Sequence, residues 1–302
     1  MPSKNAQMAS IGSFNQRSPK TIMDPNNYSN FLFCTSYFFL CLFVCSFMMV
    51  VAHNNLVAVQ AHTPLNDFAH QYTPQLLGAG MEYCELVAIT LLCLAICTLL
   101  IRSDRALIWC RLANIAGTVF LLRAASMFLT TIPIPHSDIQ CHEGILATTP
   151  FEYLQRTVNI YLHGGLYING VKICGDYMFS GHTSGITLLS LFVCHYTPES
   201  FWPLRKCVFV LNVLGTFFII CAREHYSVDI LIALVVCVLC FNYYHALVDA
   251  RHTSSWFYPT YPFAEEFREH KNVLYQWPFA KPAYLSELTR KLNLTIRDQK
   301  FN

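Results

Sequence analysis

The chain has 302 residues, of which 54% are hydrophobic and 13% are charged, whereas roughly 25% of the residues in an average soluble domain are charged. Its formal net charge is +2, and its Lys and Arg residues stand in short scattered groups, without the basic stripe that a nucleic-acid partner requires. The composition therefore excludes an ordinary water-soluble domain and a nucleic-acid-binding protein, and it predicts an integral membrane protein.

Residues 1–30 are predicted to form an N-terminal tail. They are polar and include Lys4, Arg17 and Lys20, so no cleavable signal peptide is expected. The first apolar run should therefore remain in the mature protein.

Six apolar runs follow, each long enough or nearly long enough to cross about 30 Å of hydrocarbon. They cover residues 31–52, 83–101, 106–129, 179–196, 207–222 and 230–247. We therefore predict an all-α membrane protein with six transmembrane helices, a membrane domain of residues 31–248 and a C-terminal tail of residues 249–302. The fifth and sixth runs are the weakest of the six, because only residues 225–229 separate them.

The distribution of Lys and Arg orients these helices. Residues 53–82 contain neither, whereas the two tails and the segments around residues 102–105 and 205–206 carry most of them. By the positive-inside rule, both termini are expected in the cytosol. The segments 53–82, 130–178 and 223–229 are then expected on the lumenal or extracellular side.

Most of the fourteen cysteines fall inside the apolar runs, where Cys behaves as a small hydrophobic residue. The cysteine pairs at 41/45, 93/97 and 237/240 lack His or Cys partners at zinc-site spacing. We therefore expect no metal site.

The stretch SGHT places His182 where the fourth apolar run begins. One interpretation is a helix N-cap, in which Ser180 or Thr183 satisfies free backbone amides and Gly181 makes a tight turn. The other is chemical, because a helix N-terminus offers amide donors to a phosphate and a nearby His can act as a general acid.

His225 and Asp229 are four residues apart, on one face of a helix that we expect to begin near Glu224. A carboxylate bonded to one ring nitrogen fixes the tautomer of a His and makes its other nitrogen a base or a nucleophile. Alternatively, the two residues merely mark the turn between two spans. With His182 at the same membrane face, they would form a phosphoryl-transfer site without metal.

Two longer motifs carry a family resemblance. CGDYMFSGHT (residues 174–183) and HYSVDILIA (residues 225–233) are similar to the sphingomyelin synthase family, within the lipid phosphatase and phosphotransferase superfamily. RAASMFLTTIP (residues 123–133) and TPLND (residues 63–67) resemble two further motifs of that family. Thr63 and Asn66 stand where the family has prolines, and Ser126 where it usually has Thr, but none of the three is a presumed catalytic residue.

The resemblance implies transfer of a phosphocholine or phosphoethanolamine headgroup from a glycerophospholipid to ceramide. The products would be a phosphosphingolipid and diacylglycerol, and no cofactor is expected. His225 would be the nucleophile that forms a phosphohistidine, and Asp229 would orient it. His182 would act as acid and then as base, at the lumenal or extracellular face.

Further residues are candidates for binding the substrate: Arg123, Glu152, Arg156, Asp176, Ser180, Gly181 and Tyr226. Arg123 lies near the end of the third apolar run, where a charge is costly, so it should be paired or functional. Asp176 is equally explained as a loop or cap residue. Glu152 and Arg156 share the amphipathic stretch FEYLQRTVNI, which need not face the site.

The expected partners are the lipid substrates and the bilayer, and a homo-oligomer is left open. The short N-terminal tail leaves no room for a helical interaction domain, so the shorter family members of the Golgi and plasma membrane are the better comparison. Cys141 and Cys174, on the oxidising side, are predicted to form a disulfide.

Two other functions compete with the transferase. A lipid phosphate phosphatase would usually show a Lys and an Arg-Pro block before its SGH, and this chain has none. A silent scaffold or channel has no physical reason to keep ionisable groups at these spacings.

Overall fold

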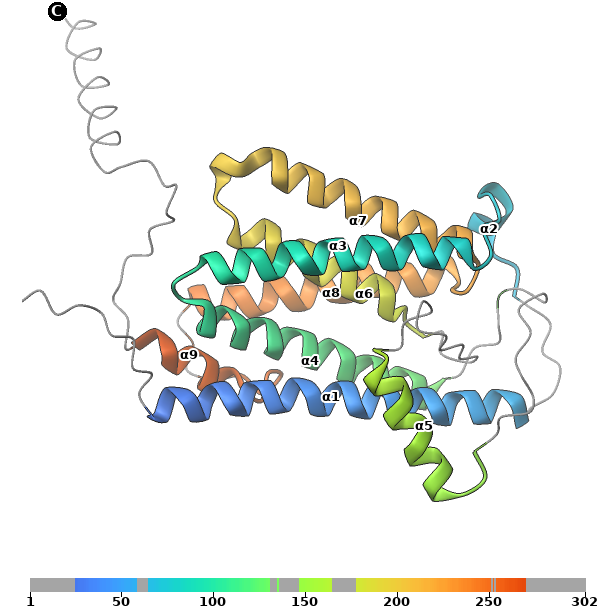
Figure 1. Ribbon diagram of the computed structural model, residues 1–302, viewed down its shortest axis with the longest axis horizontal. Helices are drawn as coiled ribbons and strands as arrows, with labels where there is room; N and C mark the ends of the chain where they lie inside the picture. Colours follow the sequence, from blue (N-terminus) through green and yellow to red (C-terminus); the bar gives the residue numbers. More distant parts are fainter. Residues whose placement is uncertain are drawn as a thin grey trace, which may run out of the picture.

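The computed structural model describes residues 25–58, 65–130, 135, 147–164, 178–250, 252 and 254–269. Within these ranges every regular element is helical (Figure 1), which confirms the all-α prediction. The helices are α1 (Pro25–Ala58), α2 (Phe68–Tyr72), α3 (Ala79–Ile101), α4 (Arg105–Leu129), α5 (Pro150–Leu162), α6 (Gly181–Tyr196), α7 (Trp202–Ala222), α8 (Ser227–Asp249) and α9 (Tyr261–Glu269).

Five helices, α1, α3, α4, α7 and α8, are long and apolar enough to cross a membrane. They correspond to five of the six expected spans, and they make the chain an integral membrane protein. The remaining run forms α6, which has 16 residues and is therefore roughly 24 Å long. This is shorter than the hydrocarbon core, so six complete spans remain a prediction.

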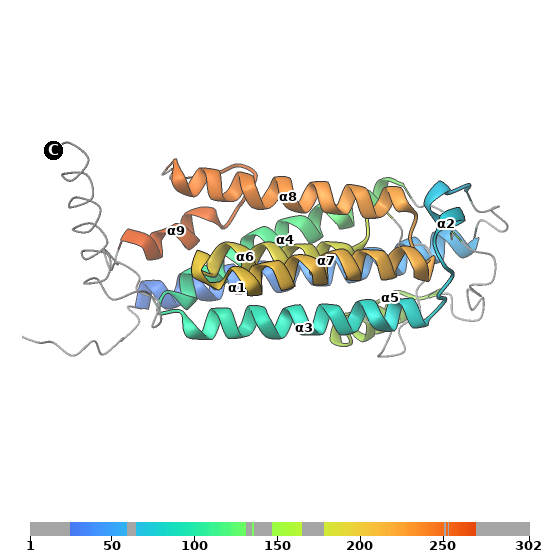
Figure 2. The ribbon, with the colours of Figure 1, turned by 90° about the horizontal axis from the view of Figure 1, so that it is seen from above.

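The short helix α6 lies at the centre of the bundle, against α3, α7 and α8, in both ribbon views (Figures 1 and 2). Its Thr183, Ser184, Thr187 and Ser190 are buried, although they belong to an apolar run. Polar side chains at membrane depth are tolerated where protein rather than lipid surrounds them. The central place of α6 therefore explains why its sequence is less apolar than that of its neighbours.

The bundle has two distinct ends. The helices α6 and α8 begin toward the end of the bundle that carries α2, at the right of Figure 1. At the other end, Arg102 donates from Nη1 to the carbonyl of Tyr196 at 3.2 Å, which joins the α3–α4 and α6–α7 connections. The segments with Arg105, Arg205 and Lys206 therefore lie at the end opposite to the starts of α6 and α8. Which end faces the cytosol stays a prediction from charge.

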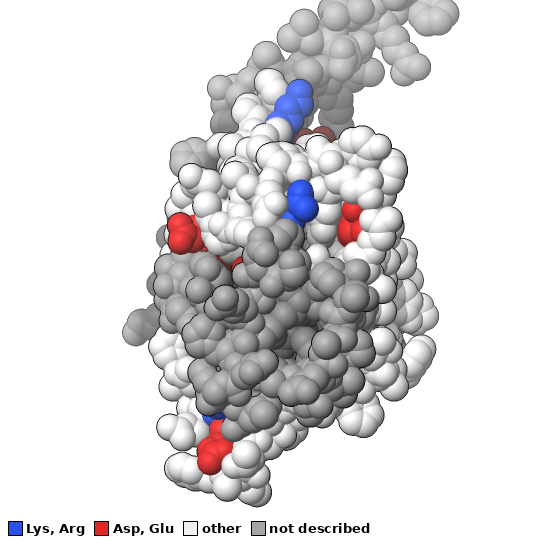
Figure 3. Space-filling view, turned by 90° about the vertical axis from the view of Figure 1, so that its right-hand side faces the viewer, with Lys and Arg blue, Asp and Glu red and all other residues white. Residues whose placement is uncertain are grey.

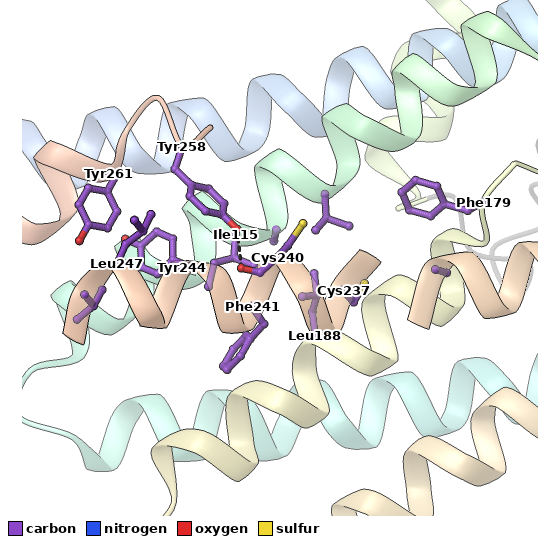
Figure 4. Packing of buried hydrophobic residues seen from close by; sticks show 14 residues of the cluster. Ile115, Phe179, Leu188, Cys237, Cys240, Phe241, Tyr244, Leu247, Tyr258 and Tyr261 are labelled. Carbon is purple, nitrogen blue, oxygen red and sulfur yellow. Dashed lines mark hydrogen bonds between the residues drawn. The ribbon is translucent and has the colours of Figure 1, made fainter. Parts of the chain in front are cut away.

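The core beside α8 is largely aromatic. Tyr244 of α8 packs against Tyr258 and Tyr261, and the hydroxyl of Tyr258 donates to the carbonyl of Cys240 (Figure 4). Cys237 and Cys240 are buried in this cluster, as expected for cysteines that act as small hydrophobic residues. The chain beyond α8 is thus folded back onto the bundle as far as α9.

An ion pair fastens α9 to α4. Arg111 donates to both carboxylate oxygens of Glu265, at 2.8 and 2.7 Å, and each side chain is about one-eighth exposed or less. Arg111→Gln would leave Glu265 buried without its cation, so we expect a loss of about 3 kcal/mol in stability. This loss of stability should be measured as a lower apparent melting temperature in detergent. Arg105→Gln, the same change at an exposed arginine of α4, should leave that temperature unchanged, and equal melting of both variants would contradict the prediction.

Candidate active site

The N-termini of α6 and α8 meet at one end of the bundle. The amide of Ser180, the N-cap of α6, donates to the carbonyl of Asp229 in the first turn of α8, at 3.4 Å. His182 is the second residue of α6, and His225 lies two residues before α8. The structure thus brings together the two sequence segments from which we predicted a catalytic site.

Ser180 caps α6, as one interpretation predicted, because its hydroxyl accepts from the amide of Thr183 at 3.3 Å. The cap does not use His182. The Nε2 of that histidine lies 3.3 Å from Oε1 of Glu85, and its side chain is 19% exposed. The imidazole therefore remains accessible beside a helix N-terminus, with a carboxylate behind it.

Glu85 is a residue that our sequence analysis missed. It belongs to α3, its side chain is fully buried, and it reaches His182 across 97 positions of sequence. The signal was present in MEYCEL, where an acidic residue stands inside an apolar run. Ionisable residues within membrane segments are costly and mark functional sites by default.

The motif RAASMFLTTIP holds the chain that enters α6. Arg123 of α4 is buried and donates from Nη1 to the carbonyl of Phe179. Ser126, one turn later on α4, donates to the carbonyl of Met178 at 2.9 Å. The buried Arg123 is paired, as its cost in apolar surroundings predicts, and its guanidinium lies against Gly181 at the start of α6.

The contact between Arg123 and Gly181 leaves little room for a side chain. A Cβ at Gly181 would stand 3.1 Å from both Cζ and Nε of Arg123, whereas a Cβ at Gly185 would meet no atom within 4 Å. Gly181→Ala should therefore displace the guanidinium and the start of α6, and we expect activity to fall about tenfold. Gly185→Ala, the same change one turn later, should keep full activity, so equal activities of the two variants would contradict this account.

His225 does not lie on a helix, which corrects our expectation of a helix beginning near Glu224. The chain leaves α7 at Arg223, whose φ of 57° is left-handed, and α8 begins only at Ser227. His225 is therefore in the turn between α7 and α8, and its side chain is buried, with 5% exposure. The four-residue spacing to Asp229 thus does not place both on one helical face.

Asp229 is fully buried in the first turn of α8. Its Oδ2 accepts from the amide of Tyr226 at 3.1 Å, so the carboxylate holds the residue that follows His225. Through its own carbonyl, Asp229 also contacts Ser180. Asp229 therefore connects the two helix starts, and a direct bond to the imidazole of His225 stays a prediction.

The other candidate residues divide into three groups. Tyr226 is buried, and its hydroxyl accepts from the amide of Leu65 at 3.0 Å. Glu152 and Arg156 lie on α5, which packs against α1. Asp176 lies outside the described residues, as do both cysteines of the predicted disulfide, Cys141 and Cys174. Contact of these candidates with a substrate stays a prediction.

Glu152 serves as a cap in this structure. Its Oε2 accepts from the amide of Thr148 at 2.7 Å, and it forms a capping box with Thr149 at the start of α5. The bonds from the Thr148 amide and hydroxyl hold the pKa of the Glu152 carboxyl below its usual value. The carboxylate is therefore charged at neutral pH whether or not it meets a substrate.

A pocket of about 350 Å³ opens beside the turn that carries His225. Its polar lining comes from Asn66, Asp67, His70, Gln71 and Arg223. Figure 3 views the molecule from this end, where the described surface carries a few scattered charged side chains. The pocket thus borders the turn, but His182 and His225 are not among its lining residues.

Asp67 is the acidic group of this pocket. Partial burial disfavours its charged form, but bonds from the amide and hydroxyl of Ser227 outweigh that effect, with help from the charge of His70. The pKa of the Asp67 carboxyl is therefore lower than usual, and the group is a carboxylate at neutral pH.

Comparison with known proteins supports the family resemblance at the site. Residues 173–246 match the family described as PAP2 superfamily C-terminal. The matched segment contains His182, His225 and Asp229, together with α6, α7 and most of α8. The three proposed catalytic residues therefore lie within the part of the chain that this family covers, whereas Glu85 and Arg123 lie before it.

Curated relatives align with most of the chain. It is 36% identical over 272 residues to sphingomyelin synthase-related protein 1 of Mus musculus, covering 88% of this chain and 56% of the relative. The protein of the same name from Homo sapiens is 36% identical, with 88% and 65% covered. Human phosphatidylcholine:ceramide cholinephosphotransferase 1 is 28% identical, with 82% and 62% covered. The chain thus spans between about half and two thirds of the length of these relatives, and the expected resemblance to the sphingomyelin synthase family is confirmed.

Proposed function

From this homology to sphingomyelin synthases and their related proteins, we propose that the chain is a headgroup transferase that acts on ceramide. It would move phosphocholine or phosphoethanolamine from a glycerophospholipid to the primary hydroxyl of ceramide, releasing diacylglycerol. One observation carries this proposal. The starts of α6 and α8 bring together His182, whose imidazole is paired with the buried Glu85, and the turn that contains His225. Two histidines, one of them paired with a buried carboxylate, suit a transfer in two steps.

In the first step, a ring nitrogen of His225 attacks the phosphorus of the donor lipid. The bond from phosphorus to the diacylglycerol oxygen breaks, and protonated His182 gives its proton to that oxygen. The product is a phosphohistidine. Glu85, whose Oε1 lies 3.3 Å from Nε2 of His182, would hold the imidazole in place for this step.

In the second step, His182 removes the proton from the ceramide hydroxyl, and the ceramide oxygen attacks phosphorus. The bond between phosphorus and nitrogen breaks, which restores neutral His225 and protonated His182. The two steps therefore balance in protons without a cofactor.

The phosphate is proposed to lie at the start of α6. The free amides of a helix N-terminus attract anions, and here they follow Ser180 and Gly181. The guanidinium of Arg123 against Gly181 adds a positive charge at the same place. These groups would stabilise the charge on the phosphoryl oxygens during both steps.

Membrane placement is part of the proposal. With six spans and cytosolic termini, the starts of α6 and α8 face the lumen or the exterior. The family resemblance points to the Golgi or the plasma membrane. The apolar helices would hold the acyl chains of both lipids and limit the access of water, which favours transfer over hydrolysis.

The test is headgroup transfer to fluorescent ceramide in membranes that contain the protein, supplied with phosphatidylcholine or phosphatidylethanolamine. We expect a fluorescent phosphosphingolipid from one or both donors. No transfer from either donor, together with phosphate release from phosphatidic acid, would overturn the proposal in favour of a lipid phosphatase.

A further inference from the structure

The turn that carries His225 is bonded to a distant segment of the chain, Leu65–Thr73, which we call the clamp segment. The segment contains α2 and precedes the turn by about 160 residues. At its start, the amide of Leu65 donates to the hydroxyl of Tyr226 at 3.0 Å. The two ends of α2 make further contacts with the same turn.

Asp67 makes the central contact. Its Oδ2 accepts from the amide of Ser227 at 2.6 Å, and its Oδ1 accepts from the Ser227 hydroxyl at 3.0 Å. The Ser227 amide is one of the first amides of α8, which have no partner within their own helix. The same carboxylate caps α2 by accepting from the amide of Ala69 at 2.9 Å. Asp67 therefore joins the start of α2 to the start of α8.

His70 contacts the backbone of His225 itself. Its Nε2 lies 3.1 Å from the carbonyl oxygen of His225, and its side chain is buried. Arg223 completes the connection by donating from Nη2 to the carbonyls of His70 and Thr73, at 2.6 and 3.2 Å. The clamp segment thus contacts the chain on both sides of His225, through the Arg223 side chain and the Ser227 amide.

Holding this backbone helps to set the place of the imidazole, because the His225 side chain is attached to it. Arg223 leaves α7 in a left-handed conformation, and Tyr226 is extended before α8 begins. Residues 223–226 lie between α7 and α8, outside both helices, and the contacts from the clamp segment and from Asp229 restrain this turn.

We propose that Asp67 is a positioning residue for His225, and that it acts through Ser227 with His70 as its partner on the His225 carbonyl. The inference rests on the function proposed above, in which His225 must approach phosphorus in line with the leaving oxygen. Displacements of about 1 Å in such a geometry lower rates about a hundredfold. Asp67 acts on the rate of transfer and does not bind the lipids.

The experiment compares Asp67→Ala, Asp67→Asn and Ser227→Ala in membranes. We expect kcat for transfer to fluorescent ceramide to fall about a hundredfold in Asp67→Ala and about tenfold in the milder Asp67→Asn, with KM for both lipids unchanged. Ser227→Ala removes only the hydroxyl bond to Asp67 and keeps the amide bond. Its kcat should therefore fall less than the kcat of either Asp67 variant. A fall in expression without a change in kcat per folded molecule would overturn the proposal.

Asp104→Asn is the matched control. Asp104 is also a carboxylate in a turn before a helix, but it bonds Arg102 at the opposite end of the bundle, at 2.9 Å. This variant should keep the wild-type kcat. If Asp67→Asn and Asp104→Asn retain the same kcat, Asp67 does not position His225.

Hydrogen–deuterium exchange separates this inference from the proposed function. The amides of residues 223–229 should exchange at least about tenfold faster in Asp67→Ala than in the wild type, while those of α3 stay unchanged. If the wild type transfers no headgroup but this exchange pattern appears, the proposed function fails and the positioning contact stands. Unchanged exchange in an active protein overturns the positioning role alone.

Discussion

His225→Ala is expected to abolish headgroup transfer, with a fall in kcat of at least about a thousandfold. The reason is chemical, because the proposed phosphohistidine cannot form without the ring nitrogen that attacks phosphorus. The imidazole belongs to a turn held by Asp67 and Asp229, so its loss should disturb the surrounding backbone little. Transfer to fluorescent ceramide, from the donor that the wild type uses, measures the effect.

The intermediate itself supplies a second measurement for this prediction. A donor labelled in its phosphate, given without ceramide, should label the wild type but not His225→Ala. A phosphorus–nitrogen bond is broken by acid and survives base, so the label should be lost at low pH. His252→Ala, at an exposed histidine beyond α8, should behave as the wild type. Transfer by His225→Ala, or an acid-stable label, would contradict the assignment.

The helices of the bundle were predictable because apolar length alone identifies them. Five of the six expected spans correspond to helices with boundaries within a few residues, although α1 extends beyond the expected run at both ends. The remaining run, 179–196, corresponds to α6 within two residues, but α6 is too short to be counted among the candidate spans. Hydropathy does not reveal whether lipid or protein surrounds a helix, and α6 lies inside the bundle.

Motif spacing selected His225 and Asp229 as the proposed catalytic pair, but it did not predict their local geometry. A spacing of four residues fits one helical face, yet His225 lies outside α8. The left-handed residue that ends α7 is Arg223, and an arginine gives no sequence signal for that conformation, as Gly or Asn would. The expectation of a helix from Glu224 failed for this reason.

Contacts between distant segments could not be predicted from one sequence. Asp67 reaches Ser227 across 160 residues, and Glu85 reaches His182 across 97. We noticed Asp67 only as part of a motif and did not consider Glu85. Glu85 could have been identified by the rule that a charged residue inside an apolar run marks a functional site. No such rule predicts the contact of Asp67, because nothing in the TPLND motif indicates that it lies at the start of α8.

Glu85→Gln is the second change for which we expect a large effect. Gln keeps the shape of the side chain and an oxygen that can accept from His182, but it removes the negative charge 3.3 Å from Nε2. The proposed mechanism needs His182 to hold a proton, give it to the diacylglycerol oxygen and take one from ceramide. We therefore expect kcat to fall about a hundredfold, the smallest effect typical of impaired acid–base catalysis. KM for both lipids should change little.

Glu82→Gln is the matched control, because Glu82 lies one turn earlier on α3 and is exposed. Both variants lose one negative charge from the same helix, so a difference between them reports the contact with His182 rather than net charge. Labelling from the donor locates the affected step, since a slower first step delays the appearance of labelled His225. If Glu85→Gln and Glu82→Gln transfer headgroups equally fast, Glu85 serves the packing of α3 against α6, and His182 works without it.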